Sequence, residues 1–204
     1  MNPNPPIDLW LVRHARPLIE PGICYGRLDM PADAAHTRES AARLAQALAG
    51  NQPQVWCSPM RRARQLADAL VAALPGVTYQ VDEALAEMDF GTWEGQPWDQ
   101  IGQPSMDQWT SRFMDHAPGG GETVAQLLTR VRQALEACHR HAQQHGHSPV
   151  VWITHAGVIR ALDVLLHHPD PNRLTAADWP RHGPGFGEWV QRHGAPPSPP
   201  APRH

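Results

Sequence analysis

Two histidines follow apolar stretches of this 204-residue sequence and have the chemistry to handle phosphate. His14 follows Arg13 in "LWLVRHARP", and His155 ends "SPVVWITH". A neutral imidazole can attack phosphorus and carry the phosphoryl group covalently. Arginine offers planar donors that suit phosphate oxygens, so Arg13 beside His14 is typical of a site for an anionic substrate. The alternative is that polar residues merely end a strand here, and the remaining motifs must decide between the two interpretations.

Further charged residues supply what phosphoryl transfer would need. Arg62, in "SPMRRARQLA", is a second candidate donor to phosphate. A carboxyl group must also protonate the leaving oxygen, and "LAEMDFGTWEG" (85–95) offers three. The candidates in that segment are Glu87, Asp89 and Glu94.

The pattern of apolar residues predicts strands that alternate with helices. Such alternation is typical of an α/β fold, a three-layer α/β/α sandwich with a mostly parallel sheet. Ligands of these folds bind beyond the carboxyl ends of the strands, where His14, Arg62 and His155 would meet. We expect strands at 7–12, 54–58, 76–83 and 148–155, and helices at 36–50, 59–74, 122–144 and 156–168.

We expect one domain over residues 1–190, followed by a proline-rich, disordered tail over 191–204. Residues 91–121 have no clear period and are interpreted as an irregular insertion with short helical pieces. Its tryptophans either cap the site and stack on a heterocyclic base, or fill the core beneath a long loop. The glycine run at 119–121 is either a phosphate cradle or a flexible turn before a helix.

Composition narrows the range of partners. A net charge of -3 and the lack of a basic block argue against a nucleic-acid surface. We expect no signal peptide and no membrane span. Three widely spaced cysteines fit reduced thiols in a cytoplasm. His141 and His145 have a spacing that would suit a metal, but a solvated helix end is the preferred interpretation, and we expect no metal or cofactor.

Taken together, the four motifs resemble those of the histidine phosphatase superfamily, also called phosphoglycerate mutase-like, over roughly residues 7–165. "LVRHARP" is similar to its Arg-His-Gly signature, with Ala15 in place of the usual glycine. The resemblance implies that His14 is phosphorylated. It further implies that Arg13, Arg62 and His155 bind phosphate, and that Glu87, which leads "EMDFGTWEG", is the proton donor.

The segment "ICYGRLDMPAD" (23–33) resembles a loop of α-ribazole phosphatases, which remove the 5′-phosphate of α-ribazole phosphate in cobalamin assembly. This implies a small phosphorylated metabolite as substrate, contacted by Gly26, Arg27 and Ala156. The alternatives are a broad-specificity phosphatase, a mutase, and a phosphate-binding protein without turnover.

Overall fold

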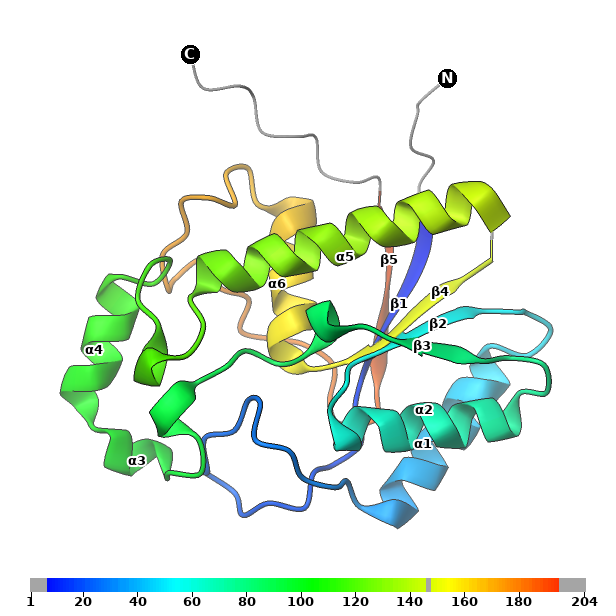
Figure 1. Cartoon of the computed structure of the whole chain (residues 1–204), viewed down its shortest axis with the longest axis horizontal. Coiled ribbons are helices and arrows are strands. Elements are labelled where there is room, and N and C mark those ends of the chain that lie inside the picture. Colours follow the sequence, from blue (N-terminus) through cyan, green and yellow to red (C-terminus); the bar gives the residue numbers. More distant parts are fainter. Residues whose placement is uncertain (1–6, 146–147, 195–204) are drawn as a thin grey trace.

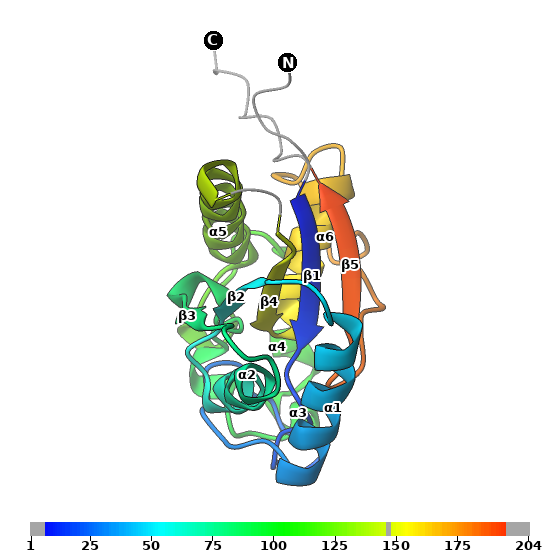
Figure 2. The ribbon, with the colours of Figure 1, turned by 90° about the vertical axis from the view of Figure 1, so that its right-hand side faces the viewer.

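A five-stranded sheet forms the centre of the computed structural model, which describes residues 7–145 and 148–194. The strand order is β3-β2-β4-β1-β5, and every neighbouring pair is parallel except β1 and β5. Figure 1 shows helices on both sides of this sheet, and Figure 2 shows β1 and β5 side by side with opposite directions. The expected three-layer, mostly parallel α/β fold is therefore confirmed.

The elements that form the sheet and its two helical layers are the following. They are β1 (Ile7–Arg13), α1 (Ala34–Ala47), β2 (Gln54–Cys57), α2 (Arg61–Ala73), β3 (Tyr79–Val81), α5 (Val124–His145), β4 (Val150–Thr154), α6 (Ala156–His167) and β5 (Trp189–Gly194). Short helices occupy the segments between β3 and α5, as expected for the irregular insertion. They are η1 (Glu83–Leu85), η2 (Gly91–Trp93), α3 (Trp98–Ile101), α4 (Gln103–Ser111) and η3 (Pro118–Gly120).

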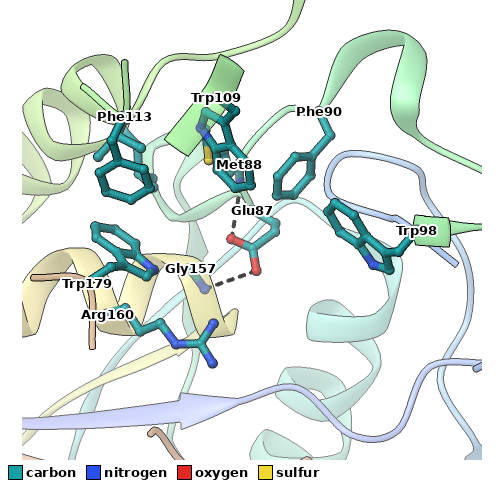
Figure 3. A pocket seen from close by; sticks show the side chains of 11 residues that line it. Glu87, Met88, Phe90, Trp98, Trp109, Phe113, Gly157, Arg160 and Trp179 are labelled. Atoms are coloured by element: carbon teal, nitrogen blue, oxygen red, sulfur yellow. Dashed lines mark hydrogen bonds between the residues drawn. The ribbon is translucent and has the colours of Figure 1, made fainter. Parts of the chain in front are cut away.

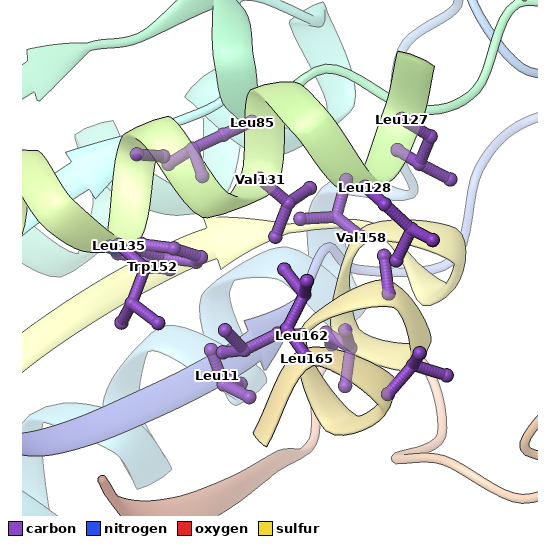
Figure 4. Close-up of a cluster of buried hydrophobic side chains, with 14 of the residues drawn as sticks. Leu11, Leu85, Leu127, Leu128, Val131, Leu135, Trp152, Val158, Leu162 and Leu165 are labelled. Atoms are coloured by element: carbon purple, nitrogen blue, oxygen red, sulfur yellow. The ribbon is translucent and has the colours of Figure 1, made fainter. Parts of the chain in front are cut away.

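Alternation along β1 divides the core into two halves. Leu9 and Leu11 pack on the side of α5 and α6, whereas Trp10 and Val12 pack on the side of α1 and α2. Successive strand residues point to opposite faces of a sheet, so a strand covered on both sides must be apolar throughout. Figure 4 shows the first half, where α5 and α6 meet above the sheet. The side chains in contact there include Leu127, Leu128, Val131, Leu135, Val158, Leu162 and Leu165.

The expected boundary at residue 190 is wrong, because residues 191–194 belong to β5. This strand pairs antiparallel with β1, from Trp189 opposite Val12 to Gly194 opposite Ile7. Only Trp189 and Val190 are apolar in "WVQRHG", since an edge strand is covered on fewer sides than a central one. The remainder of the expected tail, 195–204, lies outside the described residues. Within them, no helix has the length and apolar character needed to cross a membrane.

Candidate active site

The two histidines lie at the carboxyl ends of adjacent parallel strands. β1 and β4 pair in register up to Arg13 and Thr154, so the residues that follow, His14 and His155, emerge together. The backbone N–H of His14 donates to the carbonyl of Thr154 at 3.0 Å, and the two imidazole centroids are 5.0 Å apart. Both side chains are almost completely buried. Sheet geometry therefore brings together the two histidines that the sequence analysis selected.

His14 is held in one neutral form. Its Nδ1 lies 2.7 Å from the carbonyl oxygen of Ala15. A carbonyl only accepts, so Nδ1 carries the hydrogen and Nε2 keeps a free lone pair. Burial, together with the nearby Arg62 charge, lowers the pKa of His14 well below its ordinary value. Ala15 offers its carbonyl to His14 without backbone strain, because among the described residues no residue other than glycine has a positive φ.

His155 is neutral for similar reasons and has a partner that sequence reasoning did not assign. Burial, followed by the charge of Arg62, lowers the pKa of His155 well below its ordinary value. Its Nε2 lies 2.7 Å from Oγ of Ser58, which follows β2 and also accepts from the backbone N–H of Met60. The place of Ser58, directly after an apolar strand, was the available signal. Ser58 fixes the ring plane of His155 beside His14.

Arg62 reaches the site from the first turn of α2 and is fully buried. Its guanidinium donates to the carbonyls of Gly26 at 2.6 Å and Leu28 at 2.9 Å, whereas its Nε has no partner. Burial lowers the pKa of this guanidinium from its ordinary value. The group still keeps its charge, because the guanidinium of arginine does not lose its proton in proteins. A buried cation with an unpaired donor is suited to an anion placed beside the histidines.

Arg13 is held by the segment that leads into β5. Its guanidinium lies 3.8 Å from the ring centroid of Phe186 and donates to the carbonyl of Pro184 at 3.3 Å. The Phe186 ring also lies 5.5 Å from the imidazole of His14. Cation–π contact orients a guanidinium without neutralising it, so Arg13 keeps its charge for a ligand. Phe186 could not be predicted as part of the site, because this segment lies outside the sequence motifs.

Glu87 lies beside this cluster, at the start of α6. Its carboxylate accepts from the backbone N–H of Gly157 at 3.1 Å and from that of Met88 at 3.0 Å. A Cβ on Gly157 would lie 2.2 Å from the Glu87 carboxylate, so a larger residue there would displace that carboxylate from its present position. The rival carboxylate, Asp89, instead accepts from the N–H of Gly91 at 2.7 Å and caps a turn. The geometry favours Glu87 over Asp89.

The expected substrate contacts at Gly26, Arg27 and Ala156 stay predictions. Gly26 has a structural reason for being glycine, since a Cβ there would lie 1.8 Å from the carbonyl oxygen of Met88. Arg27 is exposed, and its backbone N–H donates to Glu94 at 2.8 Å. The Glu94 carboxylate also accepts from the N–H groups of Leu28 and Phe90, which ties the loop at 23–33 to the insertion. Ala156 is half-buried and begins α6 directly after His155.

The glycine run at 119–121 packs against backbone. A Cβ on Gly119 would lie 2.1 Å from the carbonyl oxygen of Phe90, and one on Gly121 would lie 2.3 Å from that of Asp89. The neighbouring Glu122 pairs with Arg130, whose guanidinium also donates to the carbonyls just before Glu87. This arrangement favours a structural role for the glycines over a phosphate cradle.

An aromatic pocket of about 270 Å³ opens on the other side of Glu87 (Figure 3). Phe113 and Trp179 stand on one side of the Glu87 carboxylate, and Phe90 and Trp98 stand on the other. Trp109 joins the two groups, since its ring lies 5.9 Å from both Phe90 and Phe113. Two of the three tryptophans of the insertion at 91–121, Trp98 and Trp109, therefore line a cavity beside the site. Trp93 is buried against Trp109 and does not line it.

Comparison with known proteins finds relatives and solved structures that are named as phosphatases. A putative phosphoserine phosphatase 2 of Hydrogenobacter thermophilus is 29% identical over 162 residues, which cover 78% of this chain and 77% of that protein. An acid phosphatase of Mycobacterium tuberculosis is 32% identical over 61% of this chain and 56% of its own length. The solved structure of a mycobacterial glucosyl-3-phosphoglycerate phosphatase superposes with a TM-score of 0.77 at 26% identity, over 91% of this chain and 89% of that one.

The relatives named here carry several phosphatase activities, and α-ribazole phosphatase is not among them. These names therefore do not show a particular similarity to α-ribazole phosphatase. They do agree on the superfamily, whose model matches residues 9–182, which is most of the sequence. The chain belongs to the histidine phosphatase superfamily, branch 1.

Proposed function

We propose that this protein is a phosphomonoesterase that transfers the phosphoryl group first to His14 and then to water. The observation that carries the proposal is the neutral His14 imidazole with its free Nε2, enclosed by charged arginines. An unprotonated nitrogen is required for attack on phosphorus. Relatives in the same superfamily that are named as phosphatases support the proposal.

In the first step, the Nε2 lone pair of His14 forms a bond to phosphorus, and the bond from phosphorus to the alcohol oxygen breaks. Arg13, Arg62 and His155 face the non-bridging oxygens and stabilise the charge on them. Protonated Glu87 gives its proton to the leaving oxygen. Free alcohol and a phosphohistidine result.

In the second step, water attacks the phosphohistidine and Glu87, now a carboxylate, takes the proton of the water. The bond between Nε2 and phosphorus breaks, so that His14 regains its lone pair and phosphate leaves. Every proton is accounted for by protein groups, and we propose that no metal or cofactor takes part. Activity that survives incubation with EDTA is the expected outcome, and a strong loss would contradict this part.

For the substrate, we propose α-ribazole 5′-phosphate. The loop that resembles α-ribazole phosphatases contacts Arg62 through the Gly26 and Leu28 carbonyls. The aromatic pocket beside Glu87 supports an alcohol that bears a flat heterocycle, because aromatic rings stack on such groups. Phosphoserine is the second candidate, favoured by the name of the relative that spans 78% of the chain.

The deciding experiment measures phosphate release from α-ribazole 5′-phosphate, phosphoserine, 3-phosphoglycerate and p-nitrophenyl phosphate, with His14→Ala as the control. Fast release from the first substrate alone, lost in the variant, is expected. Similar slow release from all four indicates a broad-specificity phosphatase, and 2-phosphoglycerate formed from 3-phosphoglycerate indicates a mutase. Phosphate binding without release would indicate a binding protein, and release unaffected by His14→Ala would contradict the nucleophile.

We also propose a cytoplasmic location. Cys24, Cys57 and Cys138 are buried free thiols in the structure. Burial raises the pKa of Cys24 and that of Cys138 to about 12, so neither forms a reactive thiolate near neutral pH. The three cysteines form no disulfide among the described residues, which supports a reducing compartment.

A further inference from the structure

A third arginine beside the site has no role in the proposed chemistry. Arg160 lies on α6, one turn after Gly157, and its half-buried side chain lines the aromatic pocket. Residues three apart on a helix share a face, so Arg160 and the Gly157 N–H that holds Glu87 face the same cavity. Figure 3 shows the Arg160 guanidinium on the same side of α6 as the Glu87 carboxylate.

Arginines elsewhere in the described part of the chain satisfy their buried Nε. Arg130 forms a bidentate ion pair with Glu122, in which its Nε donates to a carboxylate oxygen at 2.6 Å. Arg192 forms a similar pair with Asp163, with its Nε at 2.7 Å from the carboxylate. Over residues 7–145 and 148–194, the buried arginine Nε atoms without a partner belong to Arg13, Arg62 and Arg160. Two of these three are assigned to phosphate. A buried donor without an acceptor is costly, so the third also indicates a place for a ligand oxygen.

The surroundings of Arg160 restrict what that ligand is. Except for Glu87 and Arg160, the side chains around the cavity are apolar or aromatic. They include Phe90, Trp98, Trp109, Phe113, Trp179 and Met88. Such walls favour a flat, weakly polar group with few oxygens. Glu87, the proposed proton donor, borders the same cavity, so this is the side on which the alcohol leaves. The place of Arg160 in the cavity beside Glu87 therefore favours the alcohol half of the substrate over its phosphate as the source of the ligand oxygen.

We propose that Arg160 is a specificity-determining residue that donates hydrogen bonds to an acceptor oxygen on the alcohol half of the phosphomonoester. The aromatic walls hold the flat part of the same alcohol. The oxygen is a hydroxyl if the substrate is a ribosyl phosphate and a carboxylate if it is a phosphorylated acid. This inference rests on the proposed phosphatase function and extends it to the class of alcohol that is released.

The test uses substrate pairs that differ only in the acceptor group, which is the two ribose hydroxyls in one pair and a carboxylate in the other. One pair is α-ribazole 5′-phosphate and its 2′,3′-dideoxy analogue, and the other is phosphoserine and phosphoethanolamine. Values of kcat and KM are measured for wild type, Arg160→Met and Arg160→Lys. Arg61→Met is the matched control, because Arg61 is exposed on α2 and does not line the cavity.

In one pair, we expect wild type to prefer the acceptor-bearing member by about tenfold or more in kcat/KM, the effect of leaving a donor unpaired. Arg160→Met should bring that ratio close to one while changing kcat/KM of the acceptor-free member by less than about threefold. Arg160→Lys should restore part of the ratio, and Arg61→Met should leave it unchanged. The pair that responds identifies a hydroxyl or a carboxylate as the acceptor.

Three results would overturn the inference. The first is a wild type without preference in either pair. The second is an equal loss for both members in Arg160→Met, as a purely structural role would give. The third is an unchanged ratio with a shifted pH profile, which would mean that Arg160 acts through Glu87. Failure of the proposed function looks different, since no phosphomonoester would then be hydrolysed in a manner dependent on His14.

Discussion

The two sides of Glu87 are built in different ways. On one side, strand ends and the first turn of α2 place His14, His155 and Arg62, with exposed fractions of 2%, 0% and 0%. On the other side, Trp98 and Trp109 belong to helices of four and nine residues in the insertion, and both are half-buried. The first side rests on the hydrogen-bonded sheet, whereas the second rests on side-chain packing between short segments.

This difference suggests a division of labour. A centre that stabilises charge on phosphorus must be rigid, because donors that have to reorganise during reaction lose their advantage. A pocket for the released alcohol has to match only shape and a few polar atoms. On this view, substitutions on the strand side abolish reaction with every substrate, and substitutions on the aromatic side change the choice among substrates.

Among single substitutions, we expect the largest effect from Arg62→Met on the strand side. Loss of this buried cation should reduce kcat/KM by about a thousandfold with every phosphomonoester, because its charge acts on the phosphoryl group that they share. Steady-state phosphate release measures this. Arg61→Met, one residue earlier and exposed, is the control and should retain activity within about threefold. Equal losses in the two variants would argue against a special role for Arg62.

Glu87→Gln should come next, with an effect that depends on the leaving group. A general acid contributes roughly a hundredfold or more where the leaving alkoxide is poor, and much less for p-nitrophenolate, which leaves without a proton. The ratio of kcat for an alkyl phosphate to kcat for p-nitrophenyl phosphate measures this difference. Asp89→Asn, which keeps an acceptor for the Gly91 N–H, is the matched control. A larger leaving-group effect in Asp89→Asn would transfer the acid role to Asp89.

Trp98→Ala tests the aromatic side. One lost ring should raise KM for a ring-bearing phosphate by about tenfold, the scale of an aromatic contact together with its buried area. The kcat for phosphoserine should change little, because that substrate leaves most of the cavity empty. Thr92→Ala, a neighbouring exposed position in the insertion, controls for a general disturbance. Equal changes for the two substrates would mean that Trp98 supports the fold alone.

The smallest effect is on stability as a function of pH. The pKa of His14 and that of His155 are well below ordinary values in the folded chain, while in the unfolded chain they return to about 6.5. The unfolded chain therefore binds more protons in acid. The stabilisation is fully present well above pH 6.5 and is lost as the pH falls through that value, so we expect a loss of roughly 1 kcal/mol for each histidine between about pH 7.5 and about pH 5.5.

Urea unfolding followed by tryptophan fluorescence at the two pH values measures this loss. His14→Gln should lose about half of the pH dependence that the two histidines cause, since glutamine has no charge to gain. The difference between wild type and variant isolates the contribution of His14 from that of the carboxylates. An identical pH dependence in both would show that His14 is not held neutral by the fold.

Much of the strand side could be predicted from the sequence, because its two histidines each follow an apolar run whose end is visible in the sequence. His14 and His155 are the clearest cases, and parallel pairing then places them together. Ser58 was in view at the end of β2, but its contact with His155 depends on the ring orientation, which no sequence pattern specifies.

The aromatic side and the last strand could not be predicted in the same way. Trp98, Trp109 and Trp179 meet through short helices and loops that have no periodicity, so only the fold brings their rings around one cavity. Phe186 reaches Arg13 from a distant glycine- and proline-rich segment. Residues 191–194, the polar half of β5, have the composition of a tail. Only their pairing with β1 shows that they form a strand.

In the proposed mechanism, the Nε2 of His14 carries the phosphoryl group between substrate and water. Mixing the enzyme with excess p-nitrophenyl phosphate, quenching within milliseconds under alkaline, denaturing conditions and mapping the peptides by mass spectrometry tests it directly. We expect a phosphate on His14 that is stable in base and lost in acid, and that is absent from His14→Ala. Phosphate on His155 or another residue would contradict this role of His14. Turnover with no phosphorylated peptide at any quench time would contradict it as well.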